Sequence, residues 1–451
     1  MAHMDPIAGW MPLTLPQLDF WEEFTFHPEE PVSTVAHFID LHGEIDEEAL
    51  VAAVARTIRE AEVLSVRFRA GGAGEAPLQI CDPDHAPTAE VFDLRAEPDP
   101  MAEAQRRMEA DVARPLDLRQ DRLSAQALYR LSDGRYLWYI RAHHIIVDGY
   151  GLALIEQRCG QLYSHYRGKG EAGHAFHPFA RFLAEEEAYR HSARFDADQA
   201  FWRDYLDMTA DLPVLAKDCE DYGGGGLHGD ATLPATLAEG LQATSKRLGI
   251  GWPDLLVLVS GLYLFHHMPR QTTGNGREVV SLWLPFMSRW GSVGAHMPAM
   301  LVNILPFHLG VEAGETVGGF LKRSAAALRR QRLHGRYRIE QIAADRKVPV
   351  GSRFFFAPLI NVLPFSAPEF AGLTARRHIL ANGPGDGFNL TFRGEDDGRN
   401  LTLHLDGDTA LMAAGDFERH RQALPEFIQA VLAPSAQELP VAGVVEKIVG
   451  G

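Results

Sequence analysis

The chain has 451 residues, of which 46% are hydrophobic and 23% are charged, so it is long enough for a substantial core divided between two domains. Its formal net charge of -17 argues against nucleic acid as a partner, because phosphate binding needs a concentrated basic surface, but it leaves room for a cationic substrate. No stretch approaches the roughly 18 to 20 uninterrupted apolar residues of a membrane span, and the N-terminus lacks a signal-peptide pattern, so we expect a cytoplasmic protein without a membrane partner.

Alternating strand-like and helix-like periodicities run through the first part of the chain. In chain order they predict a helix opening at residues 13–21, a strand at 34–41, a helix at 45–61, a strand at 63–68, a helix at 100–112, strands at 123–131 and 135–143, and a helix at 151–166. Strands that alternate with helices are typical of an α/β fold. A glycine- and histidine-containing segment at 168–177 interrupts the periodicity and marks a boundary between two lobes.

The second part repeats the general plan of the first. It predicts helices at 179–206, 252–266, 317–333 and 416–432, and strands at 279–285, 300–309, 357–363, 388–393 and 401–405. We therefore expect an α/β protein with an N-terminal lobe at residues 5–175 and a C-terminal lobe at residues 176–451.

The three cysteines, Cys81, Cys159 and Cys219, are widely separated and form no C-x-x-C pair. This spacing suggests neither a disulfide framework nor a zinc site. We expect free thiols and no metal centre.

The most informative stretch is His143-His144-Ile145-Ile146-Val147-Asp148-Gly149. It places two imidazoles, a carboxylate and a glycine between a predicted buried strand and a predicted helix. Such a connection lets one ring point into a cleft while the other packs backward, and a neutral imidazole is the usual base near pH 7. This spacing is more specific than a lone histidine.

The motif H-H-x-x-x-D-G resembles the active-site signature of the condensation-domain superfamily, which includes nonribosomal peptide synthetase condensation domains and is related to chloramphenicol acetyltransferase. Residues 13–21 resemble the first motif of that superfamily, and Leu301-Val302-Asn303-Ile304-Leu305-Pro306 resembles the core of the fifth. The stretches 250–254, 283–293 and 333–342 are similar to the stand-alone amide synthase of vibriobactin biosynthesis, a catechol siderophore pathway.

This resemblance implies two chloramphenicol-acetyltransferase-like lobes that form a V-shaped pseudo-dimer, with a central tunnel and the histidine motif midway along it. It also implies a free-standing condensation enzyme of siderophore-type biosynthesis. The donor would be an aryl group, 2,3-dihydroxybenzoyl, on the phosphopantetheine thioester of an aryl or acyl carrier protein, and the acceptor a soluble di- or polyamine. Consistent with a free-standing enzyme, the chain shows neither an adenylation domain nor a carrier-protein serine motif, so both would act in trans. We expect no bound cofactor.

Amide formation from a thioester needs an unprotonated amine and a way to stabilise the developing oxyanion. We expect His144 either to accept the amine proton or to hold the nucleophile, and the sequence leaves both roles open. His143 is expected to be structural, because adjacent residues of an extended segment face opposite ways. Gly149 is expected to permit a close backbone approach, with its amide facing the thioester oxygen.

Three further residues have two interpretations each, and a fourth is expected to be structural. Asp148 is either a catalytic carboxylate or, as we favour, the ion-pair partner of Arg289. Asn361, in an apolar strand, lines the tunnel or makes structural hydrogen bonds. Trp290 stacks on an aryl donor or a cationic acceptor, or packs beneath its own loop. Asn303 is expected to be structural.

Two other functions remain open at this stage. One is a condensation domain of a larger synthetase that uses a carrier-bound aminoacyl acceptor, and the other is a non-catalytic, condensation-like module that recruits partners. The intact histidine motif favours a catalyst, since a recruitment platform has no chemical need for it. The long similarity to a stand-alone enzyme favours a free amine acceptor.

Overall fold

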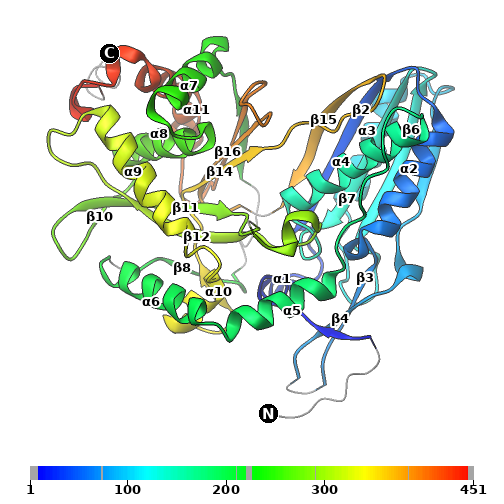
Figure 1. Ribbon diagram of the computed structural model, residues 1–451, viewed down its shortest axis with the longest axis horizontal. Helices are drawn as coiled ribbons and strands as arrows, with labels where there is room; N and C mark the ends of the chain where they lie inside the picture. The colour runs from blue at the N-terminus through cyan, green and yellow to red at the C-terminus, as the bar shows by residue number, and fades with distance from the viewer. Residues whose placement is uncertain are drawn as a thin grey trace. The chain divides into compact units, whose positions relative to one another are not determined.

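The computed structural model describes residues 9–72, 75–209, 211–219, 226–289, 291–383 and 385–444 (Figure 1), and its contacts divide the chain into two compact units. Unit 1 comprises Met1–His191, Arg289–Leu301 and Ala367–Pro384, and unit 2 comprises Ser192–Ser288, Val302–Ser366 and Gly385–Gly451. These bounds differ from the expected break after residue 175, because two later segments return to unit 1.

Unit 1 is built around a five-stranded sheet with the strand order β15-β2-β7-β6-β5. Its elements are β1 (Met11–Pro12), α1 (Leu15–Phe26), β2 (Thr34–Gly43), α2 (Glu47–Glu60), β3 (Val66–Arg69), β4 (Leu78–Cys81), β5 (Ala89–Asp93), α3 (Pro100–Val112), β6 (Ser124–Ser132), β7 (Arg135–His143), α4 (Gly149–Tyr166), α5 (Phe179–Arg190) and β15 (Leu373–Asn382). Strands β1, β4 and β3 form a separate small sheet. Only β5 and β6 pair in parallel within the five-stranded sheet.

Both faces of this sheet are covered, which explains why its central strand β7 is apolar from Tyr136 to Ile140. Trp138 and Ile140 pack in one cluster with residues of α2 and α4, whereas Leu137 and Tyr139 pack in another with residues of α3. Alternate residues of a strand point to opposite faces. A strand between two helical layers therefore needs apolar residues at both its odd and its even positions. The layers are visible in Figure 1 as α2 and α4 beside the blue and cyan strands.

Unit 2 contains a seven-stranded sheet with the order β10-β11-β14-β16-β17-β9, on which β12 pairs with β11. Its elements are α6 (Ala193–Asp207), β8 (Val214–Ala216), β9 (Leu227–Ala231), α7 (Ala235–Leu248), α8 (Trp252–His267), β10 (Gln271–Thr272), β11 (Glu278–Phe286), β12 (Asn303–Leu309), α9 (Val317–Arg332), α10 (Ile339–Asp345), β13 (Ser352–Phe354), β14 (Leu359–Pro364), β16 (Phe388–Gly394), β17 (Thr402–Gly407) and α11 (Ala414–Leu432). Strands β11, β14 and β16 run parallel, and β16, β17 and β9 run antiparallel.

Helix α8 is the centre of the unit 2 core. It is buried from Leu255 to Phe265, where it contacts strand and helix residues of one large cluster. Within the described part of the chain no single helix is both long and apolar enough to cross a membrane. Among the described residues, one helix pair, Thr236–Leu248 and Trp252–His267, has the length and composition of a membrane span when the two helices are taken together, but the pair is bent by 105°.

Two expected elements differ from the structure, and one strand that positions the site was not expected. The predicted helix at 179–206 is two helices, because Ser192 has an extended backbone and its side chain caps α6 by accepting a hydrogen bond from the Phe195 amide. The predicted strand at 63–68 begins as a 3₁₀ turn, Glu62–Ser65. Strand β15 was not predicted, and it supplies an edge of the unit 1 sheet by pairing antiparallel with β2.

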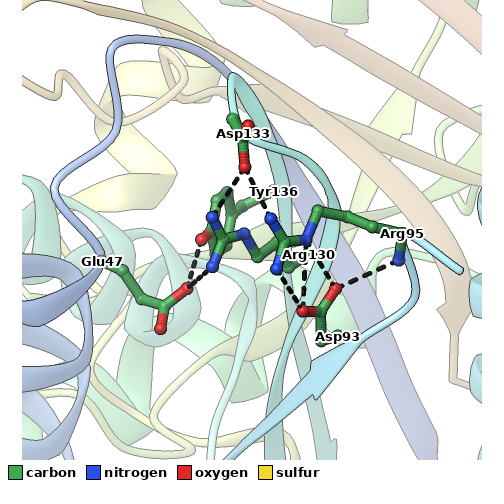
Figure 2. Close-up of polar contacts among 6 residues, drawn as sticks. All are labelled: Glu47, Asp93, Arg95, Arg130, Asp133 and Tyr136. Atoms are coloured by element: carbon green, nitrogen blue, oxygen red, sulfur yellow. Dashed lines mark hydrogen bonds and ion pairs between the residues drawn. The ribbon is translucent and has the colours of Figure 1, made fainter.

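Charged side chains join α2 to the strand ends at β5, β6 and β7 (Figure 2). The hydrogen bonds link Arg130 to Glu47 and Asp133, and Arg95 to Asp133 and Asp93. The Asp133 side chain is 82% exposed, and exposed ion pairs contribute little to stability because water screens them. The apolar layers on either side therefore carry most of the stability of this sheet.

Candidate active site

The histidine motif lies where β7 turns into α4. The His143 amide donates to the Leu123 carbonyl (2.8 Å) and the His144 amide to the Ser33 carbonyl (2.7 Å), so both residues are anchored beside the sheet. The His143 ring is buried, and its Nδ1 accepts a hydrogen bond from the Ile145 amide at 3.1 Å. His144 is only partly buried. The two rings therefore differ in exposure as predicted, and the inner ring shapes the turn.

Asp148 caps the helix that follows. Its Oδ1 accepts from the Gly151 amide at 2.8 Å and its Oδ2 from the Leu301 amide at 2.9 Å. The same carboxylate receives both Arg289 contacts, at 2.8 Å to Oδ1 and 2.7 Å to Oδ2. The predicted ion pair between Asp148 and Arg289 is confirmed, and both side chains are buried.

Arg289 connects the motif to the segment 289–301. It donates to the carbonyls of Gly294, Met297 and Ala299 at 2.7 to 2.9 Å, and its guanidinium lies 4.9 Å from the centre of the Tyr150 ring. One buried cation thus binds three carbonyl groups of that segment beside the start of α4. Burial alone would raise the pKa of Asp148, but the Arg289 charge and the amide hydrogen bonds outweigh it and hold that pKa below its usual value. Asp148 is therefore an ionised, fully engaged carboxylate.

The environment of the two histidines keeps them neutral. Burial lowers the pKa of His143 to about 3, and the neighbouring His144 and Arg141 act in the same direction. Burial also lowers the pKa of His144, although the Asp148 charge and backbone hydrogen bonds oppose this effect. A neutral, partly exposed imidazole can accept a proton near pH 7, and His144 meets that requirement.

Two residues far away in sequence define the space around His144. The Phe20 ring stacks on the His144 ring with 5.4 Å between centroids. Gly383, with a φ of +79°, follows β15 and donates its amide to the Thr34 carbonyl (3.0 Å). A Cβ on Gly383 would lie 2.8 Å from Cδ2 of His144, so any side chain there would push the ring. The sequence offers no signal that links residue 383 to residue 144.

A buried ionic cluster holds β15 in place and was missed from the sequence. Glu156 of α4 lies 2.9 Å from Nδ1 of His37 on β2, and Arg377 of β15 donates its Nε to the same carboxylate at 2.8 Å. Burial alone would raise the pKa of Glu156, but His37 and Arg377 outweigh it and lower that pKa to about 2. A glutamate on the apolar face of a predicted helix is the signal that could have revealed this cluster.

The other predicted residues lie as follows. Gly149 is the exposed first residue of α4, and its role in backbone conformation or close approach stays a prediction. At Gly151, two residues on, a Cβ would lie 2.7 Å from Val147 and 3.1 Å from the Ala299 amide. Asn361 is partly exposed on β14 of unit 2, and its two interpretations, tunnel lining or structural hydrogen bonding, stay predictions; Ile360 is the buried residue of that strand. Trp290 lies outside the described residues.

Asn303 is structural, as predicted. Its Nδ2 donates to the carbonyls of Gly335 and Tyr337 at 3.0 Å each, and its Oδ1 accepts from the Ile339 amide at 3.0 Å. These bonds join β12 to the start of α10 inside unit 2. Among the described residues no disulfide joins Cys81, Cys159 or Cys219.

Comparison with known proteins gives consistent matches over nearly the whole chain. The Condensation domain family model matches residues 7–444. A dimodular nonribosomal peptide synthase of Bacillus subtilis (strain 168) is 30% identical over 423 residues, which are 93% of this chain and 17% of that protein. Enterobactin synthase component F of Escherichia coli (strain K12) is 30% identical over 383 residues, 83% of this chain and 29% of that protein. The chain spans less than a third of the length of either relative.

Solved structures extend the similarity to the fold. The crystal structure of VibH, described as a nonribosomal peptide synthetase condensation enzyme, has a TM-score of 0.85 and 33% identity, and the match covers 95% of this chain and 100% of VibH. The starter condensation domain of rhizomide synthetase RzmA has a TM-score of 0.76 and 26% identity, covering 96% and 98%. These matches confirm the predicted α/β fold class related to chloramphenicol acetyltransferase.

Proposed function

Because the chain belongs to the condensation-domain family, whose members form amide bonds in nonribosomal peptide synthesis, we propose that it joins an aryl acyl group, 2,3-dihydroxybenzoyl, to a soluble di- or polyamine. The acyl group would arrive as a phosphopantetheine thioester on an aryl carrier protein. The observation that carries the proposed reaction is the neutral, partly exposed His144 at the end of β7, beside an Asp148 that is already fully engaged by Arg289.

In the proposed reaction the amine nitrogen attacks the thioester carbonyl carbon. A C–N bond forms, the C–S bond breaks, the amine loses a proton and the phosphopantetheine sulfur gains one. The Nδ1 of His144 is buried. We therefore assign substrate contact to Nε2. We assign to it the acceptance or orientation of the amine proton, a role that typically contributes about 10²- to 10⁴-fold. The Gly149 amide, at the start of α4, is our candidate for the oxyanion donor.

Asp148 has a positioning role in this proposal. Its carboxylate contacts Arg289 and the backbone amides of its own helix turn and of residue 301, and these contacts orient the turn that carries His144. Its negative charge also raises the pKa of His144, which opposes the lowering of that pKa by burial. It therefore acts on the reaction through His144.

The choice of substrates rests on similarity and charge. VibH matches over its full length, and the curated relatives include enterobactin synthase component F and the vanchrobactin synthetase VabF. A net charge of -17 suits an acceptor that keeps a second ammonium group while the first one reacts. The competing proposals are a carrier-bound aminoacyl acceptor and a non-catalytic recruitment module.

One experiment separates these three proposals. The chain is incubated with dihydroxybenzoyl-loaded aryl carrier protein and either a polyamine, a diamine, a monoamine of equal length or an aminoacyl carrier protein, and the products are read by mass spectrometry. We expect amide from the di- and polyamines, with an advantage over the monoamine that shrinks at high salt because screening weakens the second charge. If only the aminoacyl carrier protein reacts, the acceptor is a carrier-bound amino acid and not a free amine. If none of the acceptors gives an amide, the result supports the non-catalytic recruitment module. His144→Ala serves as the matched inactive control.

A further inference from the structure

The antiparallel strands β9 and β17 of unit 2 carry two histidines and two aspartates on one face. His228 lies opposite Asp406 and Asp230 lies opposite His404 in the strand register. Residues two apart on a strand share a face, and directly opposed residues share it too, so all four side chains project to the same side. The sheet register thus assembles a compact group from positions about 175 residues apart.

Three of these side chains converge through specific atoms. The Asp406 Oδ1 lies 2.7 Å from Nδ1 of His228 and 3.1 Å from Nε2 of His404. One ligand atom from each residue lies within 4.8 Å of the other two. Two imidazole nitrogens and a carboxylate oxygen at this separation match the ligand set of a three-ligand zinc site that keeps a water in the fourth position.

We propose that His228, His404 and Asp406 form a binding site for Zn²⁺ or a similar first-row transition ion. With metal–ligand bonds of about 2.0 to 2.2 Å in tetrahedral geometry, ligand atoms stand about 3.3 to 3.5 Å apart. The two observed contacts, 2.7 Å and 3.1 Å, would therefore widen by about 0.2 to 0.8 Å as the ion enters between the groups. Imidazole ligands favour zinc, nickel or copper over magnesium or calcium.

The fourth residue supplies the outer contact that such sites use. Nδ1 of His404, the nitrogen that does not face Asp406, lies 2.9 Å from Oδ1 of Asp230. A metal-ligating histidine characteristically donates its other N–H to a carboxylate, which fixes the ring orientation and the tautomer. His404 is thus held between an outer carboxylate and the proposed metal position, an arrangement that a simple surface ion pair does not need.

The site is open to an ion from solution. The His228 side chain is 62% exposed, and those of His404 and Asp406 are 26% and 24% exposed. The nearby cation Arg421 approaches β9 from the other face, where its Cδ lies 3.0 Å from the position of a Cβ on Gly229. Its guanidinium is also paired with Glu418. The face with the two histidines therefore has a negative balance that favours a cation.

The test is titration of the full chain, stripped with chelator, with zinc chloride by isothermal calorimetry. We expect one equivalent to bind, with affinity reduced more than tenfold in His404→Ala, His228→Ala and Asp406→Asn. Asp230→Asn should lose about tenfold, as is typical of an outer carboxylate. His42→Ala, which removes an exposed histidine that also faces a carboxylate, is the matched control and should bind as the native chain does. Native protein should also melt a few degrees higher with zinc.

Several results would overturn the proposal. These are no binding of one equivalent of zinc, unchanged affinity in His404→Ala, an equal loss in His42→Ala, or a preference for Mg²⁺ or Ca²⁺ over Zn²⁺. Far-ultraviolet circular dichroism checks that each variant is folded. If His404→Ala does not fold, His228→Ala decides the question, because that side chain lies exposed on the edge strand.

Discussion

The buried ion pair between Asp148 and Arg289 makes a sharp prediction for Asp148→Ala. The substitution leaves the buried Arg289 charge without its carboxylate partner, and it removes the cap of α4. Breaking a buried pair costs about 3 to 5 kcal/mol and losing a cap about 1 kcal/mol. For a unit of this size the melting temperature should fall on the order of 10 °C, together with activity.

A matched control separates the cap from the pair. Asp46 caps α2 in the same unit by accepting from the Ala49 amide at 3.0 Å, but its side chain is 42% exposed and its contact with Arg167 is a loose 3.9 Å. Asp46→Ala should therefore lower the free energy of unfolding by about 1 kcal/mol only. The difference between the two variants measures the buried pair.

The assay is thermal and urea unfolding followed by circular dichroism, with amide formation measured on the same samples. Arg289→Met alone and Asp148→Ala alone should each destabilise strongly, and the double variant should cost less than their sum by about 1 to 3 kcal/mol. An Asp148→Ala protein with an unchanged melting temperature and no activity would refute this reasoning and assign Asp148 a direct part in the chemistry.

Three further predictions address His144 and the cluster beneath β15. His144→Ala should lose about 10²- to 10⁴-fold in amide formation while its melting temperature stays near native, and near-native turnover would remove His144 from the mechanism. Gly383→Ala should reduce kcat more than Gly372→Ala, because both glycines have a φ near +80° but only a Cβ at 383 meets His144; equal losses would show that backbone strain alone is responsible. The pKa of Glu156 is lowered to about 2, so its contribution to stability is present above pH 4.5 and is lost as the pH falls toward 2. Glu156→Gln should accordingly be less stable at neutral pH, with a flatter urea-unfolding profile between pH 5 and 3 than the native chain, and parallel profiles would contradict this.

Local sequence patterns were sufficient to predict most helices and strands and to locate the histidine motif. The ranges expected for α3 and β7 coincide with Pro100–Val112 and Arg135–His143 in the structure. Periodicity and caps act over a few residues, so a sequence window contains the information that decides them. The alternation of exposure between His143 and His144 follows from the same local geometry.

Tertiary structure alone decided which distant residues meet. Strand β15 pairs with β2 more than 300 positions earlier, and this pairing brings Gly383 against His144 and Arg377 against Glu156. The register of β9 on β17 likewise places His228 beside Asp406, although their spacing in the sequence indicates no metal site. Strand partners and registers depend on which faces can be buried together once the whole core forms, and a shift of one residue would turn every side chain to the opposite face.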